Sequence, residues 1–529
     1  MIMLSSDDVS GDEIRETNLL VSLVFSDMFK SVLGPKGLNK LIVKEEDFDL
    51  VSSNGLYILT ELDYDEHPTA NMIMDAGRTQ SEETGDGVTT VLVLIGELLK
   101  RGFDLNEQGV PFPIVAKAYS YALEKSMDIL DDITITEGLS DEFLFNIART
   151  SLKHHRDLAG TLVECVKRIS DEFPIDTDDV TIVAESGKGI VCTEFIEGVV
   201  VDRSGLRSDL PKKIENGNIA LINLPVERKK PRADAKLKIS NPSYLRGFKN
   251  EESAEFRAII NTIRDSGADI VCCQKAVDDE AVDILGRDDV IILKRVKNTD
   301  LKRLSKSTGA DIIDEISELD SEKLGSCELI TEKKFSSNKY IFFEGCPHHK
   351  SSAIVIRGSD MHVLEGIVSE VKNAMRCIAT AIEDQRVLPG GGATEMELAK
   401  RLRKYGNTIG GKEQLAIHVF ADALEVIPRT IAKNLGMDPI DAIIELNTSH
   451  ENDTKIGISG DSRGMKDMIS EGVVDPFKVK RQAIISSTSA AIALLRVDDL
   501  VVAKQEAKTG LRQEYESPEF KYRRGRIKY

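Results

Sequence analysis

Several features that mark membrane, secreted and zinc-binding proteins are missing from this sequence. No run of about 18 uninterrupted apolar residues appears, so no membrane-spanning helix is expected. The N-terminal MIMLSSDDVSGDE is acidic, whereas a secretory signal begins basic and continues apolar. The seven cysteines include no CxxC spacing, which predicts structural thiols kept reduced in a cytoplasmic protein.

Positive charge is scarce relative to negative charge. The 69 lysines and arginines face 89 aspartates and glutamates, which gives a formal net charge of −20. A body with this charge repels the phosphate backbone of nucleic acids, so nucleic acid is not expected as a main ligand. The GxxxxGK[ST] signature and a kinase-like set of catalytic residues are absent too, which argues against a phosphotransferase of those classes.

The length of the chain indicates more than one domain. Its 529 residues exceed what one hydrophobic core usually organises, so we expect two or three domains. The apolar share of 41% and the charged share of 30% are typical of folded globular protein.

Three glycine-rich loops adjoin predicted helices. An apolar repeat of helical period runs over 19–32 and stops at a glycine loop. The segment 88–99 is apolar on nearly every face and directly follows the glycines of 85–87, which predicts a buried helix. The third loop, 390–392, precedes an amphipathic stretch over 393–405.

The middle of the chain has short β-rich runs instead. These runs are 268–273, 290–295, 339–345 and 352–358. A helical stretch between the first two predicts an α/β unit inserted between two mainly helical regions. The polar, proline-containing segment 225–247 is expected to be an excursion from that unit.

The loop GDGVTT, residues 85–90, suits phosphate binding. Free backbone N–H groups and the dipole at a helix N-terminus both favour an anion. Asp86 could hold magnesium, which shares one or two carboxylates with substrate phosphates, and the hydroxyls of Thr89 and Thr90 could contact phosphate oxygens. Taken alone, such a loop is explained equally well by a tight solvent-exposed turn.

Six longer motifs allow a comparison with a known family. They are LGPKGLNKLIV (33–43), EHPTANMIMDAGRTQSEETGDGVTT (66–90), LPGGGATEMELAKRL (388–402), ADALEVIPRTIAKNLGMDPIDAI (421–443), GVVDPFKVK (472–480) and LLRVDDLVVAK (494–504). With these motifs in order, the sequence resembles the group II chaperonins, the archaeal thermosome and the eukaryotic cytosolic ring chaperonin, along nearly its whole length. It looks more like an archaeal thermosome subunit than a eukaryotic one.

The resemblance implies a multidomain α+β chaperonin fold. A mainly helical equatorial domain would comprise 1–138 and 391–529, a small α/β intermediate domain 139–202 and 361–390, and an α/β apical domain with a helical lid protrusion 203–360. It also implies a homo- or hetero-oligomeric double ring of eight or nine subunits per ring. Such a ring uses ATP and Mg²⁺ to encapsulate unfolded client proteins and assist their folding.

The resemblance also implies a set of site residues. The nucleotide would contact Leu33, Gly34, Pro35, Gly87, Thr89, Thr90, Gly391, Gly392 and Asp475. Asp86 would be the magnesium ligand.

The sequence departs from the family at the expected catalytic positions. Asn54 stands where the family's NDG motif has an aspartate beside the phosphates, and Asn373 stands where it has the aspartate thought to activate the attacking water. An amide cannot replace a carboxylate as a base or a metal anchor. Val88 replaces a family threonine, and His155 falls at the position of a lysine that senses the γ-phosphate, although Lys153 lies two residues away.

Helical periodicity bears on Asn373 independently of the family. A stripe of apolar residues recurs at 364, 367, 371, 375, 378 and 382. At about 100° per residue, Asn373 lies about 200° from Val371, so it is expected to project away from the packed face. Without the resemblance, a solvated polar residue is the simpler interpretation.

Two functions follow from these observations. The first is an ATP-dependent folding machine, and the second is a regulatory or structural subunit that binds nucleotide but barely hydrolyses it. Asn54 and Asn373 favour the second, because loss of a general base typically costs about 10²- to 10⁴-fold in rate.

Overall fold

The computed structural model describes twelve stretches of the chain. They are 11–43, 50–62, 67–136, 140–153, 155–170, 173–187, 192–202, 213–228, 242–335, 338–348, 351–358 and 361–497. Two segments lie outside them: residues 229–241 of the proline-containing excursion, and residues 521–528, which are rich in lysine and arginine. Within these stretches, every helix is too short or too polar to cross a membrane.

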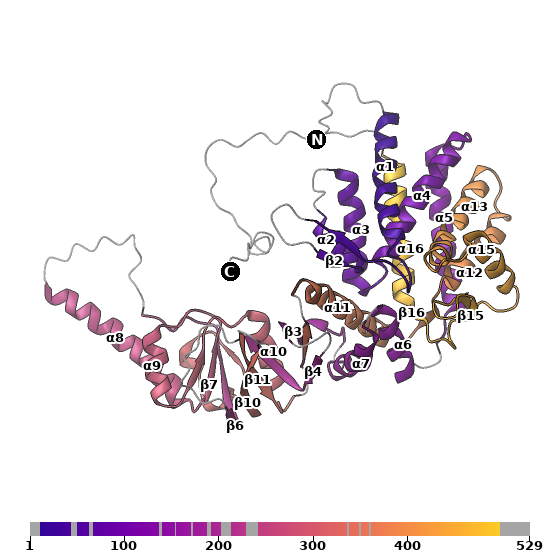
Figure 1. The fold of residues 1–529 in the computed structure, drawn as a ribbon. Helices are drawn as coiled ribbons and strands as arrows, with labels where there is room; N and C mark the ends of the chain where they lie inside the picture. Colours follow the sequence, from indigo (N-terminus) through magenta and orange to yellow (C-terminus); the bar gives the residue numbers. More distant parts are fainter. Residues whose placement is uncertain are drawn as a thin grey trace.

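Helices from the two ends of the chain share one hydrophobic core, and we call this part the helical body. Its helices are α1 (Gly11–Lys30), α2 (Gly55–Glu61), α3 (Pro68–Thr84), α4 (Val88–Glu107), α5 (Phe112–Ile133), α12 (Ala393–Gly406), α13 (Lys412–Leu424), α14 (Val426–Asn434), α15 (Pro439–Ser449) and α16 (Phe477–Leu495). In Figure 1 the indigo helix α1 and the yellow helix α16 lie side by side with α4. As predicted from its sequence, α4 is buried on nearly every face.

The helical body also has three two-stranded sheets. They are β1 (Lys40–Ile42) with β2 (Leu50–Ser52), β13 (Val387–Pro389) with β16 (Val474–Pro476), and β14 (Ile456–Ile458) with β15 (Met465–Asp467). All three pairs are antiparallel.

A three-stranded sheet with its covering helices forms a second part, the small-sheet body. The strands are β3 (Val180–Ser186), β12 (Ser352–Gly358) and β4 (Cys192–Ile196), in that order across the sheet. The apolar faces of α6 (Asp141–Ser151), α7 (Ala159–Arg168) and α11 (Met361–Asp384) pack in the core beside it. The apolar stripe predicted on 364–382 is the face by which α11 enters this core.

A larger mixed sheet forms the third part, the large-sheet body. Its strand order is β5-β11-β10-β6-β7-β8, with β9 paired to β6. The bounds are β5 (Gly198–Asp202), β6 (Lys213–Ile222), β7 (Ile270–Cys273), β8 (Ile291–Leu293), β9 (Ile312–Ile313), β10 (Gly325–Phe335) and β11 (Asn338–Glu344). The helices are α8 (Pro242–Asp265), α9 (Asp279–Arg287) and α10 (Asn298–Thr308). Figure 1 shows α8 extending outward beyond the sheet.

Strand pairing differs in two places from the ranges expected from the sequence. β5 lies before the boundary expected at 202/203, yet it pairs with β11 in the larger sheet. β12 lies before the boundary expected at 360/361, yet it pairs with β3 and β4 in the smaller sheet. Local β-propensity identified β12 but not β5, and the partners of both strands depend on pairing that is distant in sequence.

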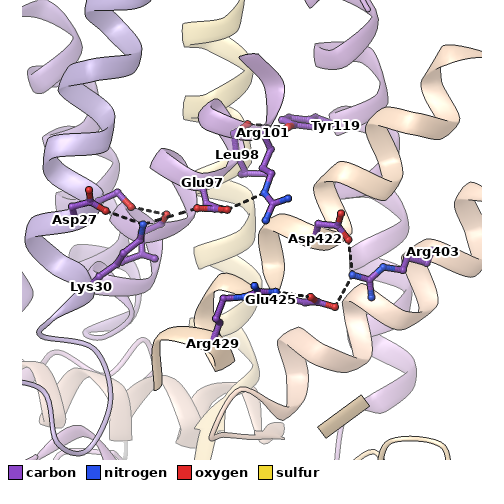
Figure 2. A network of polar contacts seen from close by, with 12 residues as sticks. Asp27, Lys30, Glu97, Leu98, Arg101, Tyr119, Arg403, Asp422, Glu425 and Arg429 are labelled. Carbon is purple, nitrogen blue, oxygen red and sulfur yellow. Dashed lines mark hydrogen bonds and ion pairs between the residues drawn. The ribbon is translucent and has the colours of Figure 1, made fainter. Parts of the chain in front are cut away.

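Two groups of ion pairs, each built on a buried glutamate, connect helices of the helical body (Figure 2). Glu97 of α4 accepts a hydrogen bond from Arg101 Nε at 2.9 Å and lies 4.0 Å from Lys30 Nζ of α1. Glu425, between α13 and α14, accepts from Arg403 of α12 at 2.6 Å. The first group links α1 to α4 and the second links α12 to the junction of α13 and α14, while the charge of Asp422 acts on Arg101 and relates the two groups electrostatically.

Candidate nucleotide site

Two adjoining cavities lie where the helical body meets the small-sheet body. The larger is lined by residues that include Gly34, Pro35, Arg149, Arg156, Gly391 and Asp475. The smaller is lined by residues that include Ser53, Asn54, Asp86, Thr89, Glu370 and Asn373. Lys153 lines both cavities and therefore marks their junction.

Strand pairing builds one wall of the larger cavity. In the β13–β16 pair, Leu388 lies opposite Asp475. The Gly390 N–H donates to the carbonyl of Val473 at 2.9 Å, so the triple-glycine loop turns directly beside Asp475. Two motifs that are far apart in the sequence thus meet at this wall.

The loop after α1 forms the opposite wall. Asn434, at the end of α14, donates through Nδ2 to the carbonyl oxygens of Lys30 and Leu33, each at 2.8 Å. Pro35 packs so closely on Gly460 that a Cβ atom there would lie 2.5 Å from Pro35 Cγ. These contacts fix the loop from two sides.

The turn between α3 and α4 presents free backbone donors. Gly87 precedes α4 and leaves the helix N-terminus without a side-chain cap. Gln80 holds the turn from behind, because its Nε2 donates to the carbonyl of Asp86 at 2.8 Å and to that of Val479 at 3.1 Å. An uncapped N-terminus with a fixed turn is a ready site for an anion.

Close backbone approaches bring α2 and α11 to this turn. A Cβ atom on Gly55 would lie 2.7 Å from Thr89 Oγ1, so the start of α2 touches the start of α4. A Cβ atom on Gly85 would lie 2.6 Å from the carbonyl oxygen of Asn373, so α11 touches the turn before α4. Only glycine permits either approach without displacing the neighbour.

Asn54 and Asn373 meet in the smaller cavity. Asn54 caps α2, its Oδ1 accepting from the N–H of Tyr57 at 3.1 Å. Asn373 is half-buried, lies off the apolar stripe of α11 and donates through Nδ2 to Asn54 Oδ1 at 3.5 Å. The side chain therefore faces the cavity rather than bulk solvent.

The cation at the cavity junction is Lys153. Its Nζ donates to the carbonyl of Val32 at 3.2 Å and to that of Ser53 at 3.5 Å. Burial lowers the pKa of Lys153, an effect that the negative charges of Asp86 and Glu370 oppose. His155 is not among the lining residues of either cavity, and burial lowers the pKa of its imidazole.

Asp86 is held with its carboxylate in the turn. Its Oδ1 accepts from the N–H of Gly87 at 2.6 Å. Burial raises the pKa of Asp86, and the charge of Asp475 adds to the rise, while the Gly87 hydrogen bond and Lys153 oppose it. A divalent cation would favour the ionised carboxylate here. In the described part of the chain, no group of three or more His, Cys, Asp or Glu could hold a metal, so an ion at Asp86 would need ligands from a bound molecule.

A buried lysine positions Asp475. Lys480 Nζ lies 3.1 Å from Asp475 Oδ2 and 2.7 Å from Glu395 Oε1. Although burial alone would lower the pKa of Lys480, the two carboxylates raise it, so the ammonium stays charged. This ion pair orients Asp475 at the cavity wall.

Comparison with known proteins identifies the family of the chain. The model of the TCP-1/cpn60 chaperonin family matches residues 25–505. The chain belongs to the TCP-1/cpn60 chaperonin family. Chaperonins of this family are ATP-driven rings that assist protein folding, and the chain is a subunit of that kind.

Archaeal thermosome subunits are similar to this chaperonin chain over nearly its whole length. A thermosome subunit of Methanopyrus kandleri is 38% identical, covering 94% of this chain and 93% of its own. Thermosome subunit beta of Methanothermobacter thermautotrophicus is 38% identical over 93% of this chain and 92% of its own. Thermosome subunit alpha of Thermoplasma acidophilum is 37% identical over 94% of this chain and 92% of its own. The chaperonin fold expected from the sequence is confirmed.

The structure brings many of the residues predicted for the chaperonin site to the two cavities. Gly34, Pro35, Gly391 and Asp475 line the larger cavity, and Asn54, Asp86, Val88, Thr89 and Asn373 line the smaller. The remaining predicted residues adjoin these in the sequence but line neither cavity; they are Leu33, Gly87, Thr90 and Gly392. Sequence reasoning missed Glu370, Gln80, Asn434 and Lys480, of which all but Glu370 lie inside motifs that it singled out.

Proposed function

We propose that this chaperonin subunit binds magnesium–ATP in the two adjoining cavities and hydrolyses it slowly. The observation that carries the proposal is the contact between Asn54 and Asn373, two amides where the family resemblance leads us to expect carboxylates. An amide has no basic lone pair at neutral pH, so neither residue can take a proton from an attacking water. Nucleotide binding is less affected, because the turn before α4 and Asp86 remain.

The larger cavity suits the nucleoside and the smaller one suits the phosphates. Asp475 would accept hydrogen bonds from the ribose, and the backbone at Gly34 and Gly391 leaves room for a flat base. The uncapped start of α4 would donate to phosphate oxygens. Lys153, at the junction, would offset phosphate charge.

Asp86 fits a magnesium ion that shares its ligands with the nucleotide. Its carboxylate accepts from the N–H of Gly87, which directly precedes α4, and burial makes it costly to ionise without a cation. Magnesium typically keeps waters and uses one or two carboxylates plus substrate phosphates. Bound there, it would neutralise charge on the phosphate oxygens.

We further propose that the helical, small-sheet and large-sheet bodies act as the equatorial, intermediate and apical domains. The subunits would form a homo- or hetero-oligomeric double ring of eight or nine subunits per ring, in the cytoplasm. Unfolded client proteins would be enclosed by the large-sheet bodies, with the outward-projecting α8 as part of the lid.

The same amide pair favours a second function. A subunit with neither aspartate would serve a hetero-oligomeric ring as a regulatory or structural member with no significant ATPase of its own. Its nucleotide occupancy would still bias the ring between conformations, because binding alone shifts such an equilibrium.

Three measurements test these proposals. Isothermal titration should detect magnesium–ATP binding, while steady-state turnover should be far below that of a chaperonin with both aspartates. Electron micrographs of the chain, alone and with partner subunits, should show double rings. Absence of nucleotide binding, or monomers under every partner and nucleotide condition, would contradict the proposal.

A further inference from the structure

The smaller cavity contains a carboxylate that the family motifs did not indicate. Two acidic side chains line it, Asp86 and Glu370. Asp86 sits in the turn before α4, where it fits the metal. Glu370 enters from α11, the helix that also carries Asn373.

The position of Glu370 is fixed by the helix and by one hydrogen bond. It precedes Asn373 by three residues, and residues three apart lie on the same face of a helix. Ser53 Oγ donates to Glu370 Oε1 at 3.2 Å, and Ser53 directly precedes Asn54. The Glu370 carboxylate is thereby held between α11 and the start of α2, beside the amide pair.

The charge of Lys153 connects the two carboxylates. Both Asp86 and Glu370 favour the charged form of its ammonium, so Lys153 lies within electrostatic reach of each. Lys153 also lies at the junction through which phosphates would enter the smaller cavity. Glu370 therefore belongs to the phosphate end of the site.

We propose that Glu370 is the general base for the slow ATP hydrolysis of this chain. The inference rests on the proposed binding of magnesium–ATP in these cavities. The water oxygen forms the new bond to the γ-phosphorus, and the bond from the γ-phosphorus to the bridging oxygen breaks with its electron pair leaving on ADP. The proton lost by the water passes to a Glu370 carboxylate oxygen, which afterwards releases it to solvent.

The length of its side chain allows Glu370 to act in place of a carboxylate at position 373. Three residues along a helix displace the backbone by about 4.5 Å along its axis. A glutamate has one more methylene than an aspartate, so Glu370 can cover part of the offset from position 373. The remaining offset accounts for slow turnover, because general-base efficiency depends on hydrogen-bond reach to the proton that is abstracted.

Single-turnover hydrolysis tests this role, with the chain in excess over labelled ATP so that slow rates are measurable. Glu370→Gln keeps the Ser53 hydrogen bond but removes the base, and we expect the rate to fall by about 10²-fold or more. Glu365→Gln is the matched control. Glu365 lies on the exposed side of α11 and accepts from Tyr57 Oη at 3.1 Å, outside both cavities, so its loss should leave the rate unchanged.

Equilibrium binding of nucleotides distinguishes a catalytic role of Glu370 from a structural one. Glu370→Gln should leave the affinity for ADP within about twofold and weaken the binding of ADP with aluminium fluoride by about tenfold, since that complex includes the positioned water. Adding Asn373→Asp to Glu370→Gln should restore turnover, because it returns a carboxylate to the same helix face.

The possible failures are distinguishable. A Glu370→Gln variant with parental turnover and parental aluminium fluoride affinity overturns the role of Glu370. Loss of ADP affinity in that variant overturns it in favour of a structural role. A parent that binds ATP but never turns it over also overturns it, while the regulatory function stands. A parent that does not bind ATP overturns the proposed function itself.

Discussion

Asn373 Nδ2 donates to Asn54 Oδ1 at 3.5 Å, so one hydrogen bond joins the two amides directly. Two aspartates at that distance could not both ionise without a nearby cation, because like charges so close raise one pKa strongly. The amide pair therefore has two effects. Neither residue can take a proton from the attacking water, and neither offers a negative charge that would attract magnesium.

Restoring both carboxylates is the most direct test of this relationship. We predict that Asn54→Asp together with Asn373→Asp raises ATP turnover by about 10²-fold or more, the usual value of a general base. Asp at position 54 can still cap α2 through the Tyr57 N–H, so the fold is preserved. Either single change should recover little, because groups that act together are not additive.

Turnover should be measured for the parent, both single variants and the double variant in the same oligomeric state. Asn447→Asp, on the exposed side of α15, adds a carboxylate away from the cavities and serves as the control. Fast parental turnover that neither reversion changes would show that the amide pair does not limit hydrolysis.

A second prediction concerns Asp86. Asp86→Asn should weaken ATP binding in magnesium by about ten- to a hundredfold, the value of a lost charge-assisted contact, and should have little effect when magnesium is chelated. Asp75→Asn, at an exposed position on α3, is the control. Equal affinities of parent and Asp86→Asn in magnesium would exclude Asp86 as the metal ligand.

A third prediction distinguishes the two candidate cations. Lys153→Gln keeps a donor for the Val32 and Ser53 carbonyls but removes the charge, so ATP affinity should fall by about tenfold, as expected for one charge-assisted contact to phosphate. His155→Gln should change it by less than about twofold. Titration of ATP against both variants checks this, and a larger effect at His155 would assign the γ-phosphate contact to the histidine instead.

A fourth prediction concerns the ion-pair network of Figure 2. Glu425→Gln removes the charge that meets Arg403 at 2.6 Å and Arg429 at 3.4 Å, and we expect α12–α14 to lose about 2 kcal/mol of local stability, the usual value of hydrogen bonds to a charged group. Hydrogen exchange of these helices measures the loss within the intact assembly. Glu413→Gln, which breaks a surface pair with Lys117, should leave the exchange of these helices nearly unchanged, because solvent screens an exposed pair.

The elements that build the site could largely be predicted from sequence, because their signals are local. The apolar period of α4 and the glycine turn before it are contained in one short stretch, and both appear in the structure as expected. The stripe on α11 correctly set Asn373 apart from the packed face.

The choice of partner residues could not be predicted in the same way. Glu370 and Lys153 lie outside the glycine motifs, and they reach the phosphate end only because α11 and the segment after α6 pack against the turn before α4. Such contacts are set by tertiary packing rather than by periodicity. The same holds for Asp475, whose place depends on the pairing of β13 with β16.

The walls of the larger cavity have a consequence for how the protein is made. One wall begins at Gly34 and the other contains Asp475, so after Gly34 a ribosome must add 475 − 34 = 441 residues, Asp475 included, before the pocket can close. At about 5–20 residues per second, this delay lasts roughly 20–90 s. The large-sheet body, whose paired strands all lie within 198–344, can fold during that interval. The larger cavity can therefore close only after the chain has been made as far as Asp475, later than the large-sheet body.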